Sequence, residues 1–259
     1  MTDAPQYTVA GTVLTMPVRV RTAYQHTAMF TVDADAAQRM IDYSGLQVCR
    51  FRSFTGRGVK GGGRALVVLM LMRYEDTDLG QYYEYGTNVM VNPPISPTPD
   101  IPTPAATGLR ALQSAGAFVH HLPVDQSFTL EAGRTIWGYP KVMADFTVRN
   151  GRRFGFDVNI DGQLAVSMEF RRGLPVPSAF TARKQVHNTY SHLDGVTRET
   201  PGEMLLSGVR YRPGGVELRL GDHPYAAELA SLGLPKRALL SSSAANVDMT
   251  FGNSRLISQ

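Results

Sequence analysis

Two short turns near the middle of the chain constrain its fold more than any other feature. The dipeptides Asn150-Gly151 and Asp161-Gly162 each separate two runs of strand-like residues. Both dipeptides favour the two-residue turns of β-hairpins, because Asn, Asp and Gly tolerate the positive φ that these turns require. The spacing therefore predicts a meander of three antiparallel strands. The predicted strands are residues 142–149, 154–160 and 163–171.

Most of the remaining chain also favours strands. Apolar and polar residues alternate over 18–22 and 28–32, whereas residues 65–72 are apolar on both faces, as in a strand buried on both sides. Further strands are predicted at 46–54, 81–91 and 117–122, as a hairpin of 205–212 with 216–220, and once or twice within 237–257. Short helices are predicted at 34–41, 107–114 and 223–229, and within 125–138, where an acidic start suits the helix dipole.

These elements define the expected fold class. Hairpins dominate, and the chain carries no glycine-rich nucleotide-binding fingerprint. We therefore predict an α+β protein that is mostly antiparallel β, closed or nearly closed around a central cavity, with short helices on its periphery. A single domain is expected over residues 1–259, with residues 1–15 as a flexible tail.

Two segments interrupt this pattern. Residues 92–104 contain six prolines and cannot form a helix or a central strand. They are interpreted as an insertion that serves as a lid, an oligomer contact or a plain surface loop. Residues 55–64 are rich in glycine and include Lys60. No Gly-Lys-Ser/Thr precedes a helix there, so a flexible hairpin loop is favoured over a phosphate-binding loop.

Composition limits the class of protein. With 43% hydrophobic and 19% charged residues, the chain can bury a sizeable core. Its formal net charge of +4 comes from scattered arginines without a dense basic run, which argues against nucleic-acid binding. The start of the chain lacks the features of a signal peptide, and the longest apolar run, Ala65 to Met72, is too short to span a bilayer. We therefore predict a cytoplasmic protein without membrane contact.

Lys141 stands out among the basic residues. Only four of the 26 Lys and Arg residues are lysines, and Lys141 lies among Trp137, Tyr139 and Val142. Apolar surroundings remove water from a lysine and disfavour its ammonium form. The neutral amine that results can attack a ketone to form a Schiff base. The alternative is a lysine that opens a strand and extends its ammonium group to water.

The histidines show no recognisable metal-binding spacing. The chain has six histidines but neither a His-x-His nor a His-Glu-x-x-His pattern. His120 and His121 are adjacent on a predicted strand, so their side chains are expected on opposite faces. We therefore predict no metal and no cofactor. His120 is a candidate to face the cavity, although a core or surface histidine fits the pattern equally well.

A family resemblance centres on the same lysine. The stretch Gly133-Arg134-Thr135-x-x-Gly138-Tyr139-Pro140-Lys141 resembles the Gly-Arg-Glu-x-x-x-Tyr-Pro-Lys signature of the acetoacetate decarboxylase family, with Lys141 at the Schiff-base lysine. Residues 76–86 resemble the family segment that ends in an active-site glutamate, which falls on Glu84. Residues 223–226 and 239–243 resemble landmarks near the family's C-terminus. The resemblance implies a β-barrel or cone-like fold that assembles as a homo-oligomer.

Three departures from the family pattern affect the expected reaction. Val142 stands where the decarboxylase has a second lysine, and Met70 where it has a second glutamate. The family's substrate arginine aligns with Ala23, two residues from Arg21. A retained lysine with altered surroundings also fits relatives that use the imine for aldol condensation and dehydration.

The resemblance implies roles for individual residues. Lys141 would form the imine, Glu84 would orient substrate or relay a proton, and Tyr82 or Tyr83 would donate a hydrogen bond. Arg134 is expected to brace the loop before the lysine. The predicted substrate-binding residues are Tyr82, Trp137, Tyr139, His120 and Arg21.

Three functions are consistent with these residues. The first is a lyase that decarboxylates a small β-oxo acid through an imine on Lys141. The second is an aldolase-dehydratase that acts on pyruvate or another oxo acid with the same lysine. The third is a β-barrel that binds a small molecule without catalysis. The expected partner is a small oxo acid, and the physiological substrate is left open.

Overall fold

A closed β-barrel forms the centre of the protein. The computed structural model describes residues 4–51, 63–94 and 114–257. Within these residues seven strands close into the barrel, because the last strand of the series pairs back with the first. In order around the barrel they are β3 (Val18–Asp33), β17 (Asn246–Phe251), β13 (Val196–Ser207), β12 (Gln185–Leu193), β6 (Gly116–Val124), β5 (Tyr82–Val91) and β4 (Arg64–Thr77). Apart from β12 with β6, these neighbours pair in antiparallel fashion, which confirms the predicted mostly antiparallel barrel.

Shorter strands extend the barrel at its ends. β16 (Leu240–Ala244), β14 (Arg210–Pro213) and β11 (Leu174–Pro175) continue the sheet from β3. β18 (Arg255–Leu256) pairs with β13, and β7 (Lys141–Met143) pairs in parallel with β6. The hairpin of β1 (Gln6–Val9) and β2 (Thr12–Thr15) buries Val9 and Leu14. The sequence analysis predicted a flexible tail over residues 1–15, whereas residues 6–15 form this packed hairpin.

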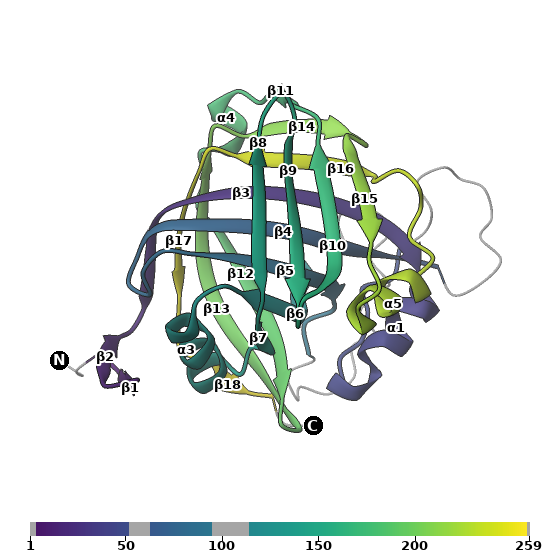
Figure 1. Ribbon diagram of the computed structural model, residues 1–259. Coiled ribbons are helices and arrows are strands. Elements are labelled where there is room, and N and C mark those ends of the chain that lie inside the picture. Colours follow the sequence, from purple (N-terminus) through teal and green to yellow (C-terminus); the bar gives the residue numbers. More distant parts are fainter. Residues whose placement is uncertain (1–3, 52–62, 95–113, 258–259) are drawn as a thin grey trace.

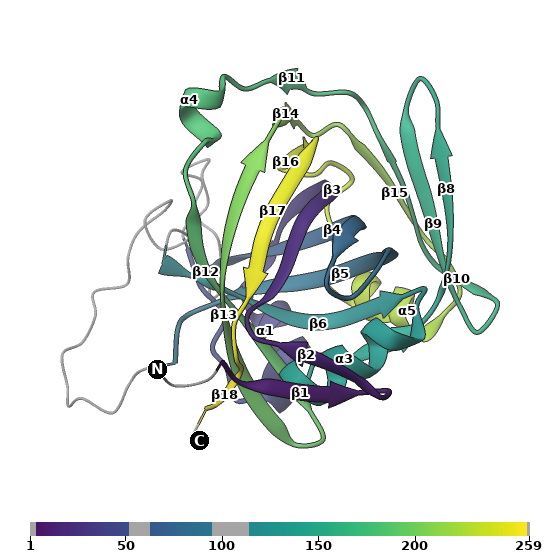
Figure 2. The same cartoon turned by 90° about the vertical axis from the view of Figure 1, so that its left-hand side faces the viewer.

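A second sheet covers one side of the barrel. It contains β15 (Val216–Leu220), β10 (Gln163–Phe170), β9 (Phe154–Ile160) and β8 (Asp145–Asn150), in that order. In Figure 1 these strands run across β3, β4 and β5, and Figure 2 shows them as a separate layer. The predicted meander is confirmed as β8, β9 and β10.

The predicted hairpin of 205–212 with 216–220 is wrong. β15 pairs with β10, whereas β14 pairs with β16 and β11. Gly214 and Gly215 both adopt a positive φ between the two strands, and the chain passes there from one sheet into the other. The turn was visible in the sequence, but the strand partners depend on the buried face of β15, which completes the second sheet.

Several other boundaries differ from the predictions. Residues 18–32 form the single long strand β3, and residues 142–149 divide at Ala144 between β7 and β8, which belong to different sheets. The expected strand 46–54 is reduced to isolated bridges at Val48 and Phe51 within the described residues. The Gly-rich segment up to residue 62, the Pro-rich segment from residue 95 and nearly all of the predicted helix 107–114 lie outside the described residues.

Short helices lie outside the barrel, as predicted. They are α1 (Ala34–Ile41), the 3₁₀ helix η1 (Asp42–Ser44), α3 (Ser127–Trp137), α4 (Ser178–Thr181) and α5 (Pro224–Ser231). The Asp33 side chain caps α1 by accepting from the backbone of Asp35 and Ala36. The acidic start predicted for α3 is wrong, because Gln126 caps this helix and Asp125 accepts from the Tyr83 backbone instead. None of the described helices has the length and apolar character needed to cross a bilayer.

The barrel wall is buried on both of its faces. One apolar layer, which includes Val20, Met72 and Trp137, lies on the inner side and under α3. A second layer, which includes Leu69 and Phe156, fills the space between the barrel and the outer sheet. Because β4 supplies residues to both layers, the run 65–72 is apolar on both faces, as predicted.

Candidate active site

The turn between α3 and β7 positions Lys141. Gly138 ends α3 with φ +63, a conformation that glycine adopts without strain, and its N–H donates to the carbonyls of Arg134 and Gly133. The chain then reverses and enters β7, where Lys141 lies beside Leu122 of β6. The Arg134 guanidinium donates to the Lys141 carbonyl at 3.2 Å. This contact supports the expected bracing role of Arg134.

Gly133 leaves room for the lysine side chain. A Cβ atom at Gly133 would lie 2.6 Å from both Cδ and Cε of Lys141. This separation is shorter than carbon atoms tolerate without a shift, so the stem of Lys141 passes directly over the glycine. The glycine of the sequence signature therefore has a packing function on the face of α3.

The Lys141 ammonium nitrogen is enclosed by protein. The residue is 3% exposed, and Nζ lies 2.8 Å from Glu84 Oε2 and 2.8 Å from Thr129 Oγ1. The same nitrogen lies 5.2 Å from the centre of the Tyr82 ring. The alternative in which the ammonium group extends into water is therefore wrong.

Glu84 is held from its other side by a pair of stacked tyrosines. Tyr74 Oη donates to Glu84 Oε1 at 3.0 Å, and the rings of Tyr74 and Tyr82 stack with centroids 4.3 Å apart. Burial, and then the negative charge of Glu84, raises the pKa of both tyrosines well above the ordinary value. Both phenols therefore stay protonated near neutral pH and are available as hydrogen-bond donors.

A small and mostly apolar cavity adjoins this pair. Its volume is about 230 Å³, and both Lys141 and Glu84 line it. The alternation of β5 turns Tyr82, Glu84 and Asn88 toward the cavity, whereas Tyr85 packs in the outer layer. Other lining side chains include Gln25, Val68, Met70, Val119, Leu122, Trp137, Tyr139, His187, Thr189, Met204, Met249 and Phe251.

A larger cavity elsewhere lacks this chemistry. It has a volume of about 470 Å³ and lies between the barrel and the outer sheet, bordered by His26, Arg152 and Arg171. Neither a lysine nor a carboxylate is found among its described lining residues. We therefore assign the candidate site to the smaller cavity.

The structure brings together five of the seven residues predicted for the site. Lys141, Glu84, Tyr82, Trp137 and Tyr139 all line the cavity. Their convergence combines β5, β7, the end of α3 and the turn that joins α3 to β7.

Arg21 lies outside the cavity, contrary to the prediction. Its side chain is 49% exposed and forms ion pairs with Asp76 and Asp78. Along the first residues of β3, Val18 and Val20 are buried while Arg19 and Arg21 are exposed. The alternation of this strand therefore turns the arginine to the surface.

His120 also points away from the cavity, because β6 contains a bulge. Thr87 of β5 lies opposite His121, but the next residue, Asn88, lies opposite Val119. His120 is thus an extra residue in the ladder, and such a residue interrupts the alternation of side chains. Val119 and Leu122 line the cavity, whereas His120 and His121 contact the same carboxylate, that of Glu228 on α5. The expectation that the two histidines point to opposite faces was wrong.

Three polar residues near the pair were missed from the sequence. Tyr74 lies directly across from Tyr82 in the β4–β5 ladder, so a correctly registered hairpin would have found it. Thr129, the partner of Lys141, gives no signal in the sequence. His187 lines the cavity, and its buried Nδ1 has no hydrogen-bond partner among the described residues. Burial lowers the pKa of His187, so this imidazole is neutral near pH 7.

Two of the three departures from the family pattern concern residues next to Lys141 or on the wall of its cavity. Val142 is 40% exposed and follows Lys141 on a strand, so a lysine at this position would extend away from Lys141 Nζ. Met70 lines the cavity and contacts Gln25, whose amide nitrogen lies 2.8 Å from the Met70 sulfur. The absence of the second lysine therefore says little about the reaction expected at the site, whereas the loss of a carboxylate at position 70 changes the cavity wall.

The fold and the site define a β-barrel with a buried amine and carboxylate beside a small cavity. The chain belongs to the acetoacetate decarboxylase (ADC) family, whose sequence profile matches residues 4–259. No curated protein sequence matches the chain significantly.

Solved structures share the fold at low sequence identity. Acetoacetate decarboxylase from Legionella pneumophila has a TM-score of 0.63 at 16% identity, over 93% of this chain and 87% of that chain. The enduracididine biosynthesis enzyme MppR, complexed with pyruvate, has a TM-score of 0.56 at 17% identity, over 95% and 92%. An acetoacetate decarboxylase-like enzyme from Sphingomonas wittichii RW1 has a TM-score of 0.50 at 15% identity, over 92% and 93%.

Proposed function

We propose that the protein is a carbon–carbon lyase that decarboxylates a small β-oxo acid through an imine on Lys141. The observation that carries this proposal is the enclosed Lys141 Nζ, which lies 2.8 Å from Glu84 at the wall of a cavity of about 230 Å³. Family membership over residues 4–259 supports it, as does the sequence resemblance that places the family's Schiff-base lysine at Lys141.

The reaction begins with the transfer of a proton from Lys141 Nζ to Glu84. The neutral amine attacks the ketone carbon, and loss of water gives the protonated imine. The carbon–carbon bond between the α-carbon and the carboxylate then breaks, and carbon dioxide leaves. The electrons of that bond enter the iminium group to form an enamine. Protonation of the enamine carbon and hydrolysis release the ketone product and restore the amine. Glu84 is the proton carrier, and Tyr74 holds its carboxylate in place.

The apolar cavity wall supports the loss of carbon dioxide. Of the described residues that line the cavity, none is an arginine, and Lys141 is the only lysine. A substrate carboxylate would meet neutral polar groups such as Gln25, Asn88 and His187. A poorly paired charge is costly in such surroundings, and decarboxylation removes it.

An aldolase-dehydratase is the second candidate. It uses the same imine but keeps the carboxylate and joins the enamine to a second carbonyl compound. Met70 in place of a family glutamate favours it, because the cavity then lacks one carboxylate of the decarboxylase pattern. The likeness to MppR, which was solved with pyruvate bound, agrees with an oxo acid of this kind.

Borohydride trapping tests the imine directly. The protein is incubated with acetoacetate or pyruvate, reduced with borohydride, digested and examined by peptide mass spectrometry. We expect a reduced adduct on Lys141 and none on Lys184, which is 68% exposed and pairs with Glu203. The variant Lys141→Ala should form no adduct, while Lys184→Ala should react like the parent protein.

Release of carbon dioxide separates the two reactions. Rapid release from acetoacetate supports the decarboxylase, whereas adduct formation with pyruvate and aldehyde-dependent product without carbon dioxide supports the aldolase-dehydratase. Failure to trap any adduct across a panel of oxo acids would leave the third function, a barrel that binds a small molecule without catalysis.

A further inference from the structure

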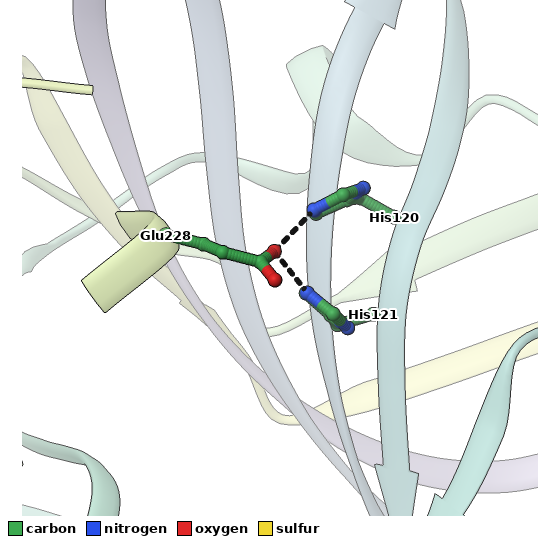
Figure 3. Close-up of side chains that lie close together, drawn as sticks. All are labelled: His120, His121 and Glu228. Atoms are coloured by element: carbon green, nitrogen blue, oxygen red, sulfur yellow. Dashed lines mark hydrogen bonds and ion pairs between the residues drawn. The ribbon is translucent and has the colours of Figure 1, made fainter. Parts of the chain in front are cut away.

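Three metal-ligating side chains converge on the outer face of β6. His120 Nε2 and His121 Nε2 lie 3.0 Å and 2.8 Å from the same oxygen, Glu228 Oε2 (Figure 3). The ligand atoms of the three residues all lie within 4.8 Å of one another. The bulge at His120 creates this arrangement, because a regular strand would turn one of two adjacent histidines to the other face.

Tyr43 supplies an outer contact to the cluster. Its hydroxyl lies 2.8 Å from His120 Nδ1. A hydroxyl can donate or accept a hydrogen bond. Tyr43 can therefore contact His120 Nδ1 whether the imidazole proton lies on Nδ1 or on Nε2. When the proton lies on Nδ1 and is donated to Tyr43, the lone pair of Nε2 is free for a metal ion. Metal-bound histidines commonly have such a partner on the second nitrogen.

The cluster opens to solvent on one side. The His120, His121 and Glu228 side chains are 7%, 29% and 48% exposed, and a cavity of about 400 Å³ borders His120 and Glu228. Arg39 also borders this cavity. Its positive charge disfavours cations that bind through charge alone, so an ion that favours imidazole nitrogen is the better fit.

We infer that His120, His121 and Glu228 form a site for a divalent transition-metal ion of the zinc type, with an open position for water or an exchangeable ligand. Two histidines and one carboxylate are an established ligand set for zinc with a free fourth position. Ligands about 2.1 Å from a tetrahedral zinc ion lie roughly 3.4 Å apart. The Glu228 oxygen now lies 3.0 and 2.8 Å from the two imidazole nitrogens, so it would move back by about 0.5 Å to admit the ion, and the ligand atoms already lie within 4.8 Å of one another. This site is independent of the lysine reaction proposed above.

Metal titration of the full-length protein tests the site. Protein freed of metal with a chelator is titrated with zinc chloride by calorimetry, and with cobalt chloride while its visible absorption is recorded. We expect one equivalent of zinc per chain and a tetrahedral or five-coordinate cobalt spectrum. The variants Glu228→Gln and His121→Gln should each weaken zinc binding by well over about ten-fold, and Tyr43→Phe by about ten-fold. His26→Gln, which changes a histidine at another cavity, should bind like the parent protein.

Several results would overturn the inference. Absence of zinc binding by the parent protein would do so, as would undiminished binding by Glu228→Gln and His121→Gln. A cobalt spectrum typical of six oxygen ligands would also exclude a two-histidine site. The parent protein's cobalt spectrum decides the case even where a variant fails to fold, and circular dichroism identifies such variants.

Discussion

Two ionic clusters occupy opposite faces of the β5–β6–β7 wall. On the inner face, the Lys141 and Glu84 side chains are 3% and 8% exposed and contact each other across 2.8 Å. On the outer face, exposure rises from 7% at His120 to 48% at Glu228. An enclosed ion pair is costly to bury and contributes little net stability, which agrees with the catalytic role proposed for it. The graded exposure of the outer cluster instead suits exchange of a ligand with solvent.

The variant Glu84→Gln gives the largest expected difference between the two clusters. It removes the proton acceptor of Lys141 but keeps an oxygen that can accept from Tyr74. The rate of adduct formation with acetoacetate should fall by roughly 10²–10⁴-fold, measured by trapping after single-turnover incubation. Zinc affinity should stay unchanged.

The folding stability of Glu84→Gln is measured as a control for its loss of adduct rate. The change leaves Lys141 buried and unpaired, so the free energy of unfolding should fall by about 3 kcal/mol, measured by urea titration. Rates are therefore compared well below the melting temperature of the variant. A loss of adduct rate smaller than ten-fold would show that Glu84 is not the proton carrier.

The variant Gly133→Ala tests how closely the inner cluster is packed. Alanine favours a helix over glycine by about 1 kcal/mol, but its Cβ would lie 2.6 Å from the lysine stem. We expect a loss of adduct rate of about ten-fold with little loss of folding stability, measured by trapping and urea titration. In the control Gly151→Ala, the nearest atom would be 3.7 Å from the new Cβ. An unchanged rate in Gly133→Ala would contradict the packing function of the glycine.

The variant Glu228→Gln has the smallest expected effect on the lysine reaction. Glu228 is outside the set of residues that line the lysine cavity. The rate of adduct formation should therefore stay within about two-fold of the parent rate, measured by the same trapping assay. A fall of more than ten-fold would show that β6 couples the two faces, and the clusters could then no longer be treated as independent.

Much of the inner cluster followed from the sequence. The signature around Lys141 and the segment ending at Glu84 identified both charged residues, because each lies in a contiguous motif. Tyr74 and Thr129 were not predicted. The register of β4 with β5 brings Tyr74 to the Lys141–Glu84 pair, and the packing of α3 brings Thr129 there, and no local sequence pattern indicates either contact. The homo-oligomeric state and cytoplasmic location remain predictions.

The outer cluster shows why the remaining features could not be predicted. The orientation of His120 depends on how β6 aligns with β5, and a one-residue bulge is invisible in the sequence of β6 alone. The partner of β15 likewise depends on a distant strand, β10. Elements defined by local turns, such as β8 to β10, were predicted well, whereas features defined by long-range register were not.

Because of the bulge in β6, the deletion of a single residue would change which side chains of this strand point to the inner face of the barrel wall and which to the outer face. Deleting Val119 would restore the regular alternation and place His120 opposite Asn88, facing the lysine cavity. The outer triad would be dismantled in the same event, and the inner cavity would acquire a titratable ring. A one-residue change in strand length would thus move an imidazole from the outer face of the barrel wall to its inner face.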